Sequence, residues 1–93
     1  MVTLPPVLTH AVAAGFVRGL PQAVQSQPSL VVADASALTQ FDSSALAVLI
    51  ECHRLALAAG KDFAVQGAPR RLLELASLYG VAGLIPLAAA VTA

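Results

Sequence analysis

The sequence of 93 residues is long enough for one domain, 1–93, with a single small core. Apolar residues make up 58% of it, charged residues 11%, and five Lys plus Arg balance five Asp plus Glu. This balance argues against nucleic-acid binding, which needs a basic face that releases phosphate counterions. The lone cysteine, Cys52, excludes an intramolecular disulfide and favours a reducing compartment such as the cytoplasm.

The first predicted elements are a strand and a helix. Segment Val2–Thr9 is apolar and β-branched but contains Pro5 and Pro6, so it is predicted to be an edge strand. Apolar residues at helical spacing predict a helix over Ala11–Val24, with a break near Pro21. A polar linker over residues 25–29 follows. The start of the chain lacks the basic leader of a secretory signal peptide.

The middle of the chain reads as strand, loop and long helix. The continuous apolar run Leu30–Ala33 predicts a strand in the centre of a sheet, covered on both faces. A polar loop over Asp34–Phe41 separates it from a helix predicted over Ser43–Ala59. That helix is expected to stop at Gly60, because glycine suits the left-handed cap position.

This helix is predicted to begin at a side-chain cap and to bury a wide apolar face. Asp42 or Ser43 would accept a hydrogen bond from the amides of its first turn. The predicted inner face is Leu46, Leu49, Ile50, His53 and Leu57, extended sideways by Ala45, Val48, Cys52, Leu55 and Ala56. The outer stripe is Ser44, Ala47, Glu51, Arg54 and Ala58. The two alanines of this stripe would let a partner approach closely, which predicts an interaction surface.

A second strand and helix are predicted to complete the fold. Segment Phe63–Val65 is expected to pair in parallel with the earlier apolar strand, since a helix connects the two. Pro69 is placed at the first position of a further helix and Gly80 at its end. The inward side chains of this helix are expected to be Leu72, Leu75, Ala76 and Tyr79.

The remaining patterns argue against several classes of protein. Gly80, Gly83 and Pro86 interrupt the apolar run Leu75–Ala93, so no membrane-spanning helix is predicted. Pro86 predicts a turn or edge in the tail Val81–Ala93. Two histidines, one cysteine and no close carboxylate pair give no ligand set for a metal, and no cofactor is expected. His10 is expected in a turn and His53 in the core or at its rim. No positioned base accompanies Ser43, and no glycine-rich phosphate loop is present, so an enzyme is not expected.

The chain resembles the STAS domain family, named for sulfate transporters and anti-sigma factor antagonists. The resemblance rests on a strand ending in Asp34, a loop, and the segment Phe41-Asp42-Ser43-Ser44-Ala45-Leu46. It implies a small mixed β-sheet with helices packed on one face, an α/β fold. It also implies that Ser43 occupies the position of the hydroxyl that kinases phosphorylate in the anti-sigma antagonist branch.

The segment Arg71-Leu-Leu-Glu-Leu-Ala-Ser-Leu-Tyr-Gly-Val resembles the MlaB-like branch of the family. That branch implies a non-catalytic cytoplasmic subunit of a bacterial phospholipid ABC transporter, which serves outer-membrane lipid asymmetry and reaches the inner membrane through the ATPase subunit. The expected partner-binding residues are Thr39, Gln40, Asp42, Ser43, Ser44, Ala47 and Glu51. Two alternatives remain: an antagonist of an anti-sigma factor serine kinase, phosphorylated on Ser43, and a homodimeric scaffold. From local chemistry alone, the two serines could also be ordinary residues of a helix start.

Overall fold

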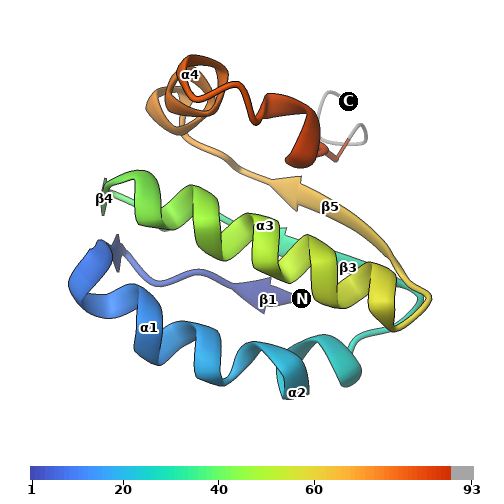
Figure 1. The fold of residues 1–93 in the computed structure, drawn as a ribbon. Helices are drawn as coiled ribbons and strands as arrows, with labels where there is room; N and C mark the ends of the chain where they lie inside the picture. The colour runs from blue at the N-terminus through green and yellow to red at the C-terminus, as the bar shows by residue number, and fades with distance from the viewer. Residues whose placement is uncertain (89–93) are drawn as a thin grey trace.

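The computed structural model describes residues 1–88. Within this range, five short strands and four α-helices follow one another (Figure 1). The strands are β1 (Val2–Thr3), β2 (Val7–Leu8), β3 (Leu30–Asp34), β4 (Gln40–Phe41) and β5 (Asp62–Gln66). The helices are α1 (His10–Arg18), α2 (Leu20–Gln25), α3 (Ser43–Ala58) and α4 (Arg70–Leu78), with a 3-10 turn, η1, at Ala82–Leu84.

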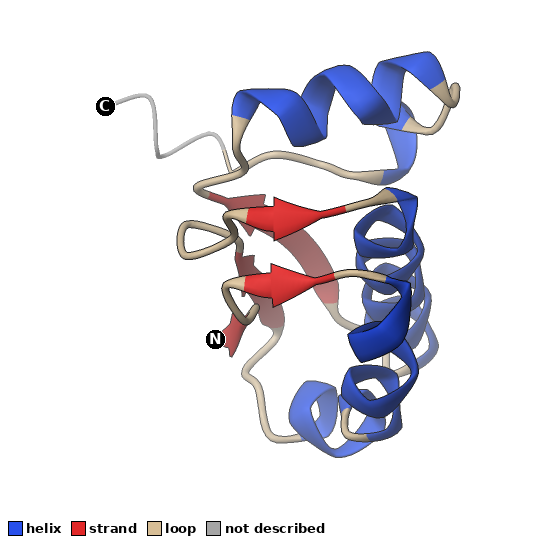
Figure 2. Ribbon diagram, turned by 90° about the vertical axis from the view of Figure 1, so that its left-hand side faces the viewer, coloured by secondary structure: helices blue, strands red, loops and turns tan. Residues whose placement is uncertain are grey.

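The main sheet has three strands in the order β1-β3-β5, and β2 pairs separately with β4. Helices α1, α2 and α3 lie on one side of the strands, and α4 lies beyond the β5 edge of the sheet (Figure 1 and Figure 2), so the α/β class with helices on one face is confirmed. The sheet was expected to be mixed, with parallel and antiparallel strands. Every strand pair among residues 1–88 is instead parallel. Helices α1 and α2 connect β1 to β3, and α3 connects β3 to β5. Each of these crossovers returns the chain in the same direction.

The predicted N-terminal strand is divided by its two prolines. Its first part, β1, lies at the edge of the sheet as expected, while β2 pairs with a different strand. The carbonyl oxygen of Pro6 accepts hydrogen bonds from the amides of Thr39 (2.9 Å) and Gln40 (3.0 Å). The following helix breaks at Gly19, two residues before Pro21, so the predicted break near Pro21 is confirmed. Pro21 lies in the first turn of α2. Backbone N–H groups there have no partner within the helix, so proline, which lacks an N–H, costs no hydrogen bond.

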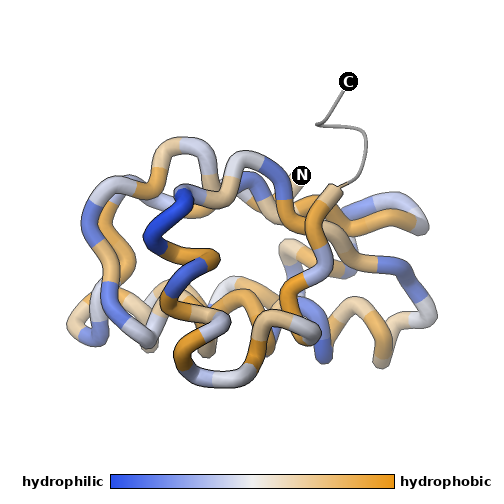
Figure 3. The backbone as a smooth tube through the Cα atoms, turned by 90° about the horizontal axis from the view of Figure 1, so that it is seen from above, coloured by the Kyte–Doolittle hydropathy of each residue, from blue (hydrophilic) through white to orange (hydrophobic). Residues whose placement is uncertain are grey.

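The core lies between the sheet and the helices. Val31 and Ala33 of β3 and Val65 of β5 are buried on the side that faces α3, and Figure 3 shows apolar residues in both layers. The expectation that β3 is covered on both faces is wrong for residues 1–88. Leu30 is 46% exposed, and Val32 is only partly buried. The apolar run therefore predicted the central position of the strand but not the number of covering layers.

Helix α3 has nearly the predicted bounds, but its buried face is rotated. The buried residues are Ala45, Leu46, Val48, Leu49, Cys52 and Ala56. Leu57, expected on the inner face, is 60% exposed, and Ile50 and His53 are only partly buried. The reason is tertiary: α1 and α2 pack beside α3, so its centre of burial turns toward them. Cys52 is buried as expected, and desolvation, with a smaller effect of the Glu51 charge, raises the pKa of its thiol to about 11.

The turn after α3 is fixed by a glycine and a lysine. Gly60 has a φ of 72°, the left-handed conformation that glycine adopts without strain. The Lys61 ammonium then donates to three carbonyl oxygens at the end of α2, those of Val24 (2.9 Å), Gln25 (3.0 Å) and Gln27 (2.6 Å). A cation at a helix C-terminus interacts favourably with the helix dipole. Lys61 thereby holds α2 against the turn between α3 and β5.

The last helix and the tail differ from the prediction in detail. Pro69 is the N-cap of α4 and not its first residue, so the helix begins at Arg70, one residue later than expected. Tyr79, expected to face inward, is 58% exposed because α4 ends at Leu78 and the chain turns away at Gly80. Leu87 forms a parallel bridge with Val65, so the tail does reach a sheet edge beside Pro86. Residues 89–93, part of the predicted apolar tail, lie outside the described residues. Within 1–88, no helix combines the length and hydropathy needed to cross a bilayer.

Candidate functional site

Asp42 joins the starts of two helices. It is the N-cap of α3, and its Oδ1 accepts a hydrogen bond from the Ser44 amide (2.8 Å). Its Oδ2 accepts one from the amide of His10 (3.0 Å), the first residue of α1. His10 therefore lies at a helix start and not in a turn as predicted. One carboxylate satisfies an amide at the positive end of each helix, which fixes the position of α1 relative to α3.

These bonds lower the pKa of Asp42, with the His10 amide as the larger cause and the Ser44 amide as the next. A carboxyl whose pKa is lower in the folded protein stabilises the fold above its unfolded pKa. This stabilisation is lost as the pH falls through the folded value, below about pH 4.

Asp42→Asn keeps one side-chain oxygen that can accept from the Ser44 amide. Its NH2 group takes the place of the other oxygen and cannot accept the hydrogen bond of the His10 amide. We expect the variant to unfold several degrees lower at pH 7 and to lose less stability in acid than the wild type does. Thermal unfolding from pH 7 to pH 2.5, followed by circular dichroism, measures both effects. As a control, Asp62→Asn should match the wild type at pH 7, because Asp62 is exposed on β5. Equal acid sensitivity of Asp42→Asn and the wild type would contradict the assignment.

The adjacent serines line two different grooves. Ser43 is exposed and contributes to a groove of about 450 Å³ between α3 and α4. We call it the α3–α4 groove. Its lining residues are Phe41, Asp42, Ser43, Arg71, Glu74, Leu75, Leu78 and Tyr79. The Arg71 guanidinium lies 5.4 Å from the centre of the Phe41 ring, which provides a cation–π contact beside Ser43.

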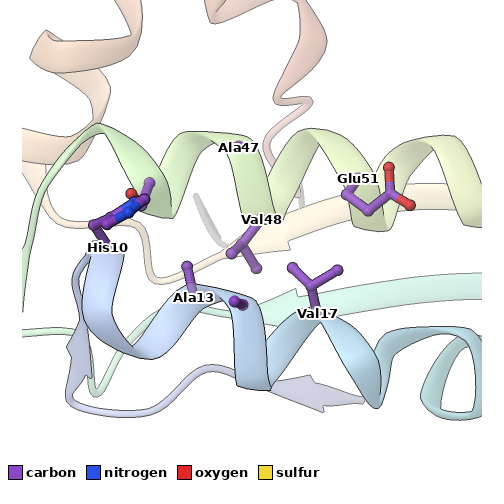
Figure 4. A pocket seen from close by; sticks show the side chains of 8 residues that line it. His10, Ala13, Val17, Ala47, Val48 and Glu51 are labelled. Carbon is purple, nitrogen blue, oxygen red and sulfur yellow. The ribbon is translucent and has the colours of Figure 1, made fainter.

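Ser44 belongs to the second groove, of about 440 Å³, between α1 and α3 (Figure 4). We call it the α1–α3 groove. Its lining residues are His10, Ala13, Ala14, Val17, Ser44, Ala47, Val48 and Glu51. The structure thus brings Ser44, Ala47 and Glu51 of the predicted stripe together along one wall. Ala13 and Val17 point toward this wall from α1 (Figure 4).

The sequence reasoning missed the α1 wall of this groove. Helix α1 has polar side chains only at its ends, His10 and Arg18, yet none of its residues is fully buried. A helix that is apolar around its circumference is usually buried on most sides. The apolar composition of α1 between its ends therefore favours, from the sequence alone, a contact of this helix with another molecule.

Thr39 and Gln40 lie outside both grooves. The Thr39 hydroxyl donates to the carbonyl oxygen of Pro6 (3.2 Å), and Gln40 pairs with Val7 in the β2–β4 ladder. Both residues are exposed, but their backbones are used to hold the N-terminal segment. The structure does not place them beside Ala47 and Glu51 in one concave surface.

Charged residues at the groove rims form local pairs. The Arg54 guanidinium binds the Glu51 carboxylate through two hydrogen bonds, and this lowers the pKa of Glu51. Arg70 forms an exposed pair with Glu74 at 3.8 Å, a geometry that contributes little to stability. Glu51 is therefore held in one orientation at the edge of the α1–α3 groove.

His53 is a satisfied histidine at the rim of the core, as predicted. Its ring stacks on Phe63 with centroids 5.0 Å apart, and its Nδ1 lies 3.0 Å from the carbonyl oxygen of Leu84. That carbonyl can only accept, so Nδ1 carries the proton. Across residues 1–88, no three His, Cys, Asp or Glu side chains come together to hold a metal ion.

The comparison with protein families identifies the chain. The family model described as the MlaB STAS domain matches residues 1–86. The chain belongs to the STAS domain family. No curated protein matches it at a significant level. In this STAS domain, the signature segment Phe41–Leu46 contains the cap and the first turn of α3, between the two grooves.

Proposed function

We propose that this STAS domain is a non-catalytic subunit that binds the cytoplasmic ATPase subunit of an Mla-type phospholipid ABC transporter. It would support assembly or activity of the transporter in phospholipid trafficking. The observation that carries the proposal is the match of residues 1–86 to the MlaB STAS domain model. In this role the protein lies in the cytoplasm and reaches the inner membrane only through its partner.

The α1–α3 groove supports the proposal as a docking surface. Its floor and walls are small and apolar at Ala13, Ala47 and Val48, so the backbone of a partner helix could approach closely. Ser44 and Glu51 provide polar groups on the same wall. This arrangement of an apolar centre with a polar rim is that of a protein interface.

Ser43 extends the proposed interface toward α4. It is exposed at the first position of α3, beside the apolar side chains of Leu75 and Leu78 in the α3–α4 groove. A partner that covers the start of α3 would contact both grooves. Thr39 and Gln40 would lie at the margin of this interface.

A charge at Ser43 tests the proposal. In co-purification with the Mla-type ATPase subunit of the same organism, we expect Ser43→Asp to abolish recovery and Ser43→Ala to retain most of it. The added carboxylate would lie beside that of Asp42 and would lose its water in the interface. The matched pair controls for loss of the hydroxyl. Equal recovery with both variants would exclude Ser43 from the interface, and recovery of no ATPase subunit with the wild type would contradict the proposed function.

The exposure of Ser43 also supports a second candidate, an antagonist of an anti-sigma factor serine kinase. A kinase could reach this hydroxyl, and a phosphate at a helix N-terminus gains from the helix dipole. The neighbouring Asp42 carboxylate would oppose that gain. Intact-mass measurement after incubation with such a kinase distinguishes the two candidates. One added phosphoryl group, absent in Ser43→Ala, would favour the antagonist.

A further inference from the structure

The sheet β1-β3-β5 has one face without a helical layer among residues 1–88. The helices gather on the other side of the strands (Figure 2). Purely parallel sheets are normally covered on both faces, because the helices that connect their strands pack on both. The usual second layer is therefore missing from the described part of the chain, and the apolar run of β3 remains half uncovered.

Strand register arranges the side chains of this face in rows. We call it the open sheet face, and its residues are Met1, Thr3, Leu30, Val32, Asp34, Asp62, Ala64 and Gln66. Its central row is apolar. Val32 pairs with Ala64. Because Val2 pairs with Ala33, the preceding residues, Met1 and Val32, also lie side by side. The Gln66 side-chain amide lies 3.4 Å from the Met1 sulfur, so these side chains meet over β3.

The open sheet face is acidic as well as apolar. Its titratable side chains are Asp34, in the polar row beside Thr3 and Gln66, and Asp62, which pairs with Leu30 at the opposite end. The ion pairs of residues 1–88 join Glu51 with Arg54 and Glu74 with Arg70, so neither aspartate is neutralised there.

The five Lys and Arg residues of the chain are placed elsewhere. Arg18, Arg54, Arg70 and Arg71 belong to helices, and the Lys61 ammonium is bonded to the end of α2. The fold thus separates its charges. All cationic side chains lie with the helical layer, while the open sheet face carries two carboxylates around an apolar centre.

We propose that the open sheet face binds a basic amphipathic helix of a partner protein. An α-helix has a diameter of about 10 Å, and three strands are about 10–14 Å wide, so one helix along the strands would cover the face. Asp34 and Asp62 lie four residues apart in register, about 13 Å along the strands. Two cations about seven or eight residues apart on the helix would reach both carboxylates, with apolar side chains between them.

Charge decides between this occupant and a second copy of the chain. Two open sheet faces packed together would oppose their acidic side chains, and the strands carry no Lys or Arg side chain to offset them. Like charges brought together in an interface are unfavourable. A basic helix instead supplies the missing layer and the missing charge. This inference does not depend on the proposed function, because the surface lies on the opposite side of the sheet from both grooves.

A pair of synthetic peptides tests the proposal. The first is a helical peptide that has leucines on one face. Two lysines flank these leucines, one on each side, about two turns apart. The second has glutamates in place of the lysines. By fluorescence anisotropy, we expect the protein to bind the lysine peptide at least about tenfold more tightly, and Asp62→Lys to remove most of that difference. Val32→Thr, which keeps the β-branched shape, should weaken binding as well.

Ala58→Arg, exposed on α3 and outside both grooves, serves as the control and should bind the lysine peptide as the wild type does. Circular dichroism checks that each variant is folded. Equal binding of the two peptides, or no effect of Asp62→Lys, would overturn the proposal. So would a dimer in sedimentation velocity that Leu30→Asp converts to a monomer, because a second copy would then occupy the face.

Discussion

Replacing Ala47 by arginine is expected to abolish binding of the ATPase subunit while leaving the fold intact. Ala47 is exposed in the middle of the α3 wall of the α1–α3 groove, between Ser44 and Glu51. A long cationic side chain there would fill the groove and prevent close approach of a partner helix. Residues at the centre of an interface carry most of its binding energy, so we expect at least about a 100-fold rise in Kd, or about 3 kcal/mol.

The matched control for this experiment is Ala58→Arg. Ala58 lies on the same outer stripe of α3, three turns further along, and is exposed outside the α1–α3 groove. Arginine is a good helix former, so both variants should unfold at the wild-type temperature. Isothermal titration calorimetry with the ATPase subunit would give the two Kd values. An equal loss with both variants, or no loss with Ala47→Arg, would place the interface elsewhere.

Leu49→Ala is expected to cause the largest loss of stability. Leu49 is 0% exposed, in the centre of α3 where the helix packs on the sheet and beside α1 and α2. Removing a fully buried leucine side chain costs about 3–4 kcal/mol, through lost apolar burial and the cavity left behind. This is a large share of the free energy of unfolding of a small domain, about 5–10 kcal/mol.

Leu57→Ala provides the comparison on the same helix. The periodicity of the sequence placed Leu57 with Leu49 on the inner face, but the structure leaves it 60% exposed. Its truncation should therefore change the free energy of unfolding by less than about 1 kcal/mol. Urea unfolding of both variants at pH 7 measures the difference. Similar losses in the two variants would favour the face expected from periodicity over the observed one.

The features that the sequence predicted well depend on local signals. The cap at Asp42, the bounds of α3 and the left-handed Gly60 follow from residues within one or two turns of one another. The parallel pairing of β3 with β5 follows from the connecting helix. Each of these predictions required only the chemistry of a short segment.

The features that it missed depend on contacts between distant segments. The rotation of the buried face of α3 results from α1 and α2 packing beside it, and the exposure of Tyr79 results from the end of α4. Neither contact has a signature in local spacing. The mixed sheet, in contrast, was implied by the family resemblance, whereas the predicted helix between the first two strands already favoured a parallel pair.

The candidate site shows the same division. Ser43 and Ser44 were treated as one feature because they are adjacent in sequence. Successive residues on a helix point about 100° apart, so the structure directs them into different grooves. The apolar composition of α1 was a signal in the sequence, but the position of Ala13 and Val17 opposite α3 could be found only once the helices were placed. The Asp42 bond to His10 joins residues 32 positions apart and had no sequence signal.

Hydrogen–deuterium exchange of the protein with and without the Mla-type ATPase subunit would locate the surface that the ATPase subunit covers. We expect slower exchange of backbone amides in α1 and in the first three turns of α3, Ser43–Cys52, when the ATPase subunit is bound. Amides of β5, on the sheet away from this surface, should exchange at unchanged rates. Protection confined to β1, β3 and β5, with α1 and the start of α3 unaffected, would contradict this expectation.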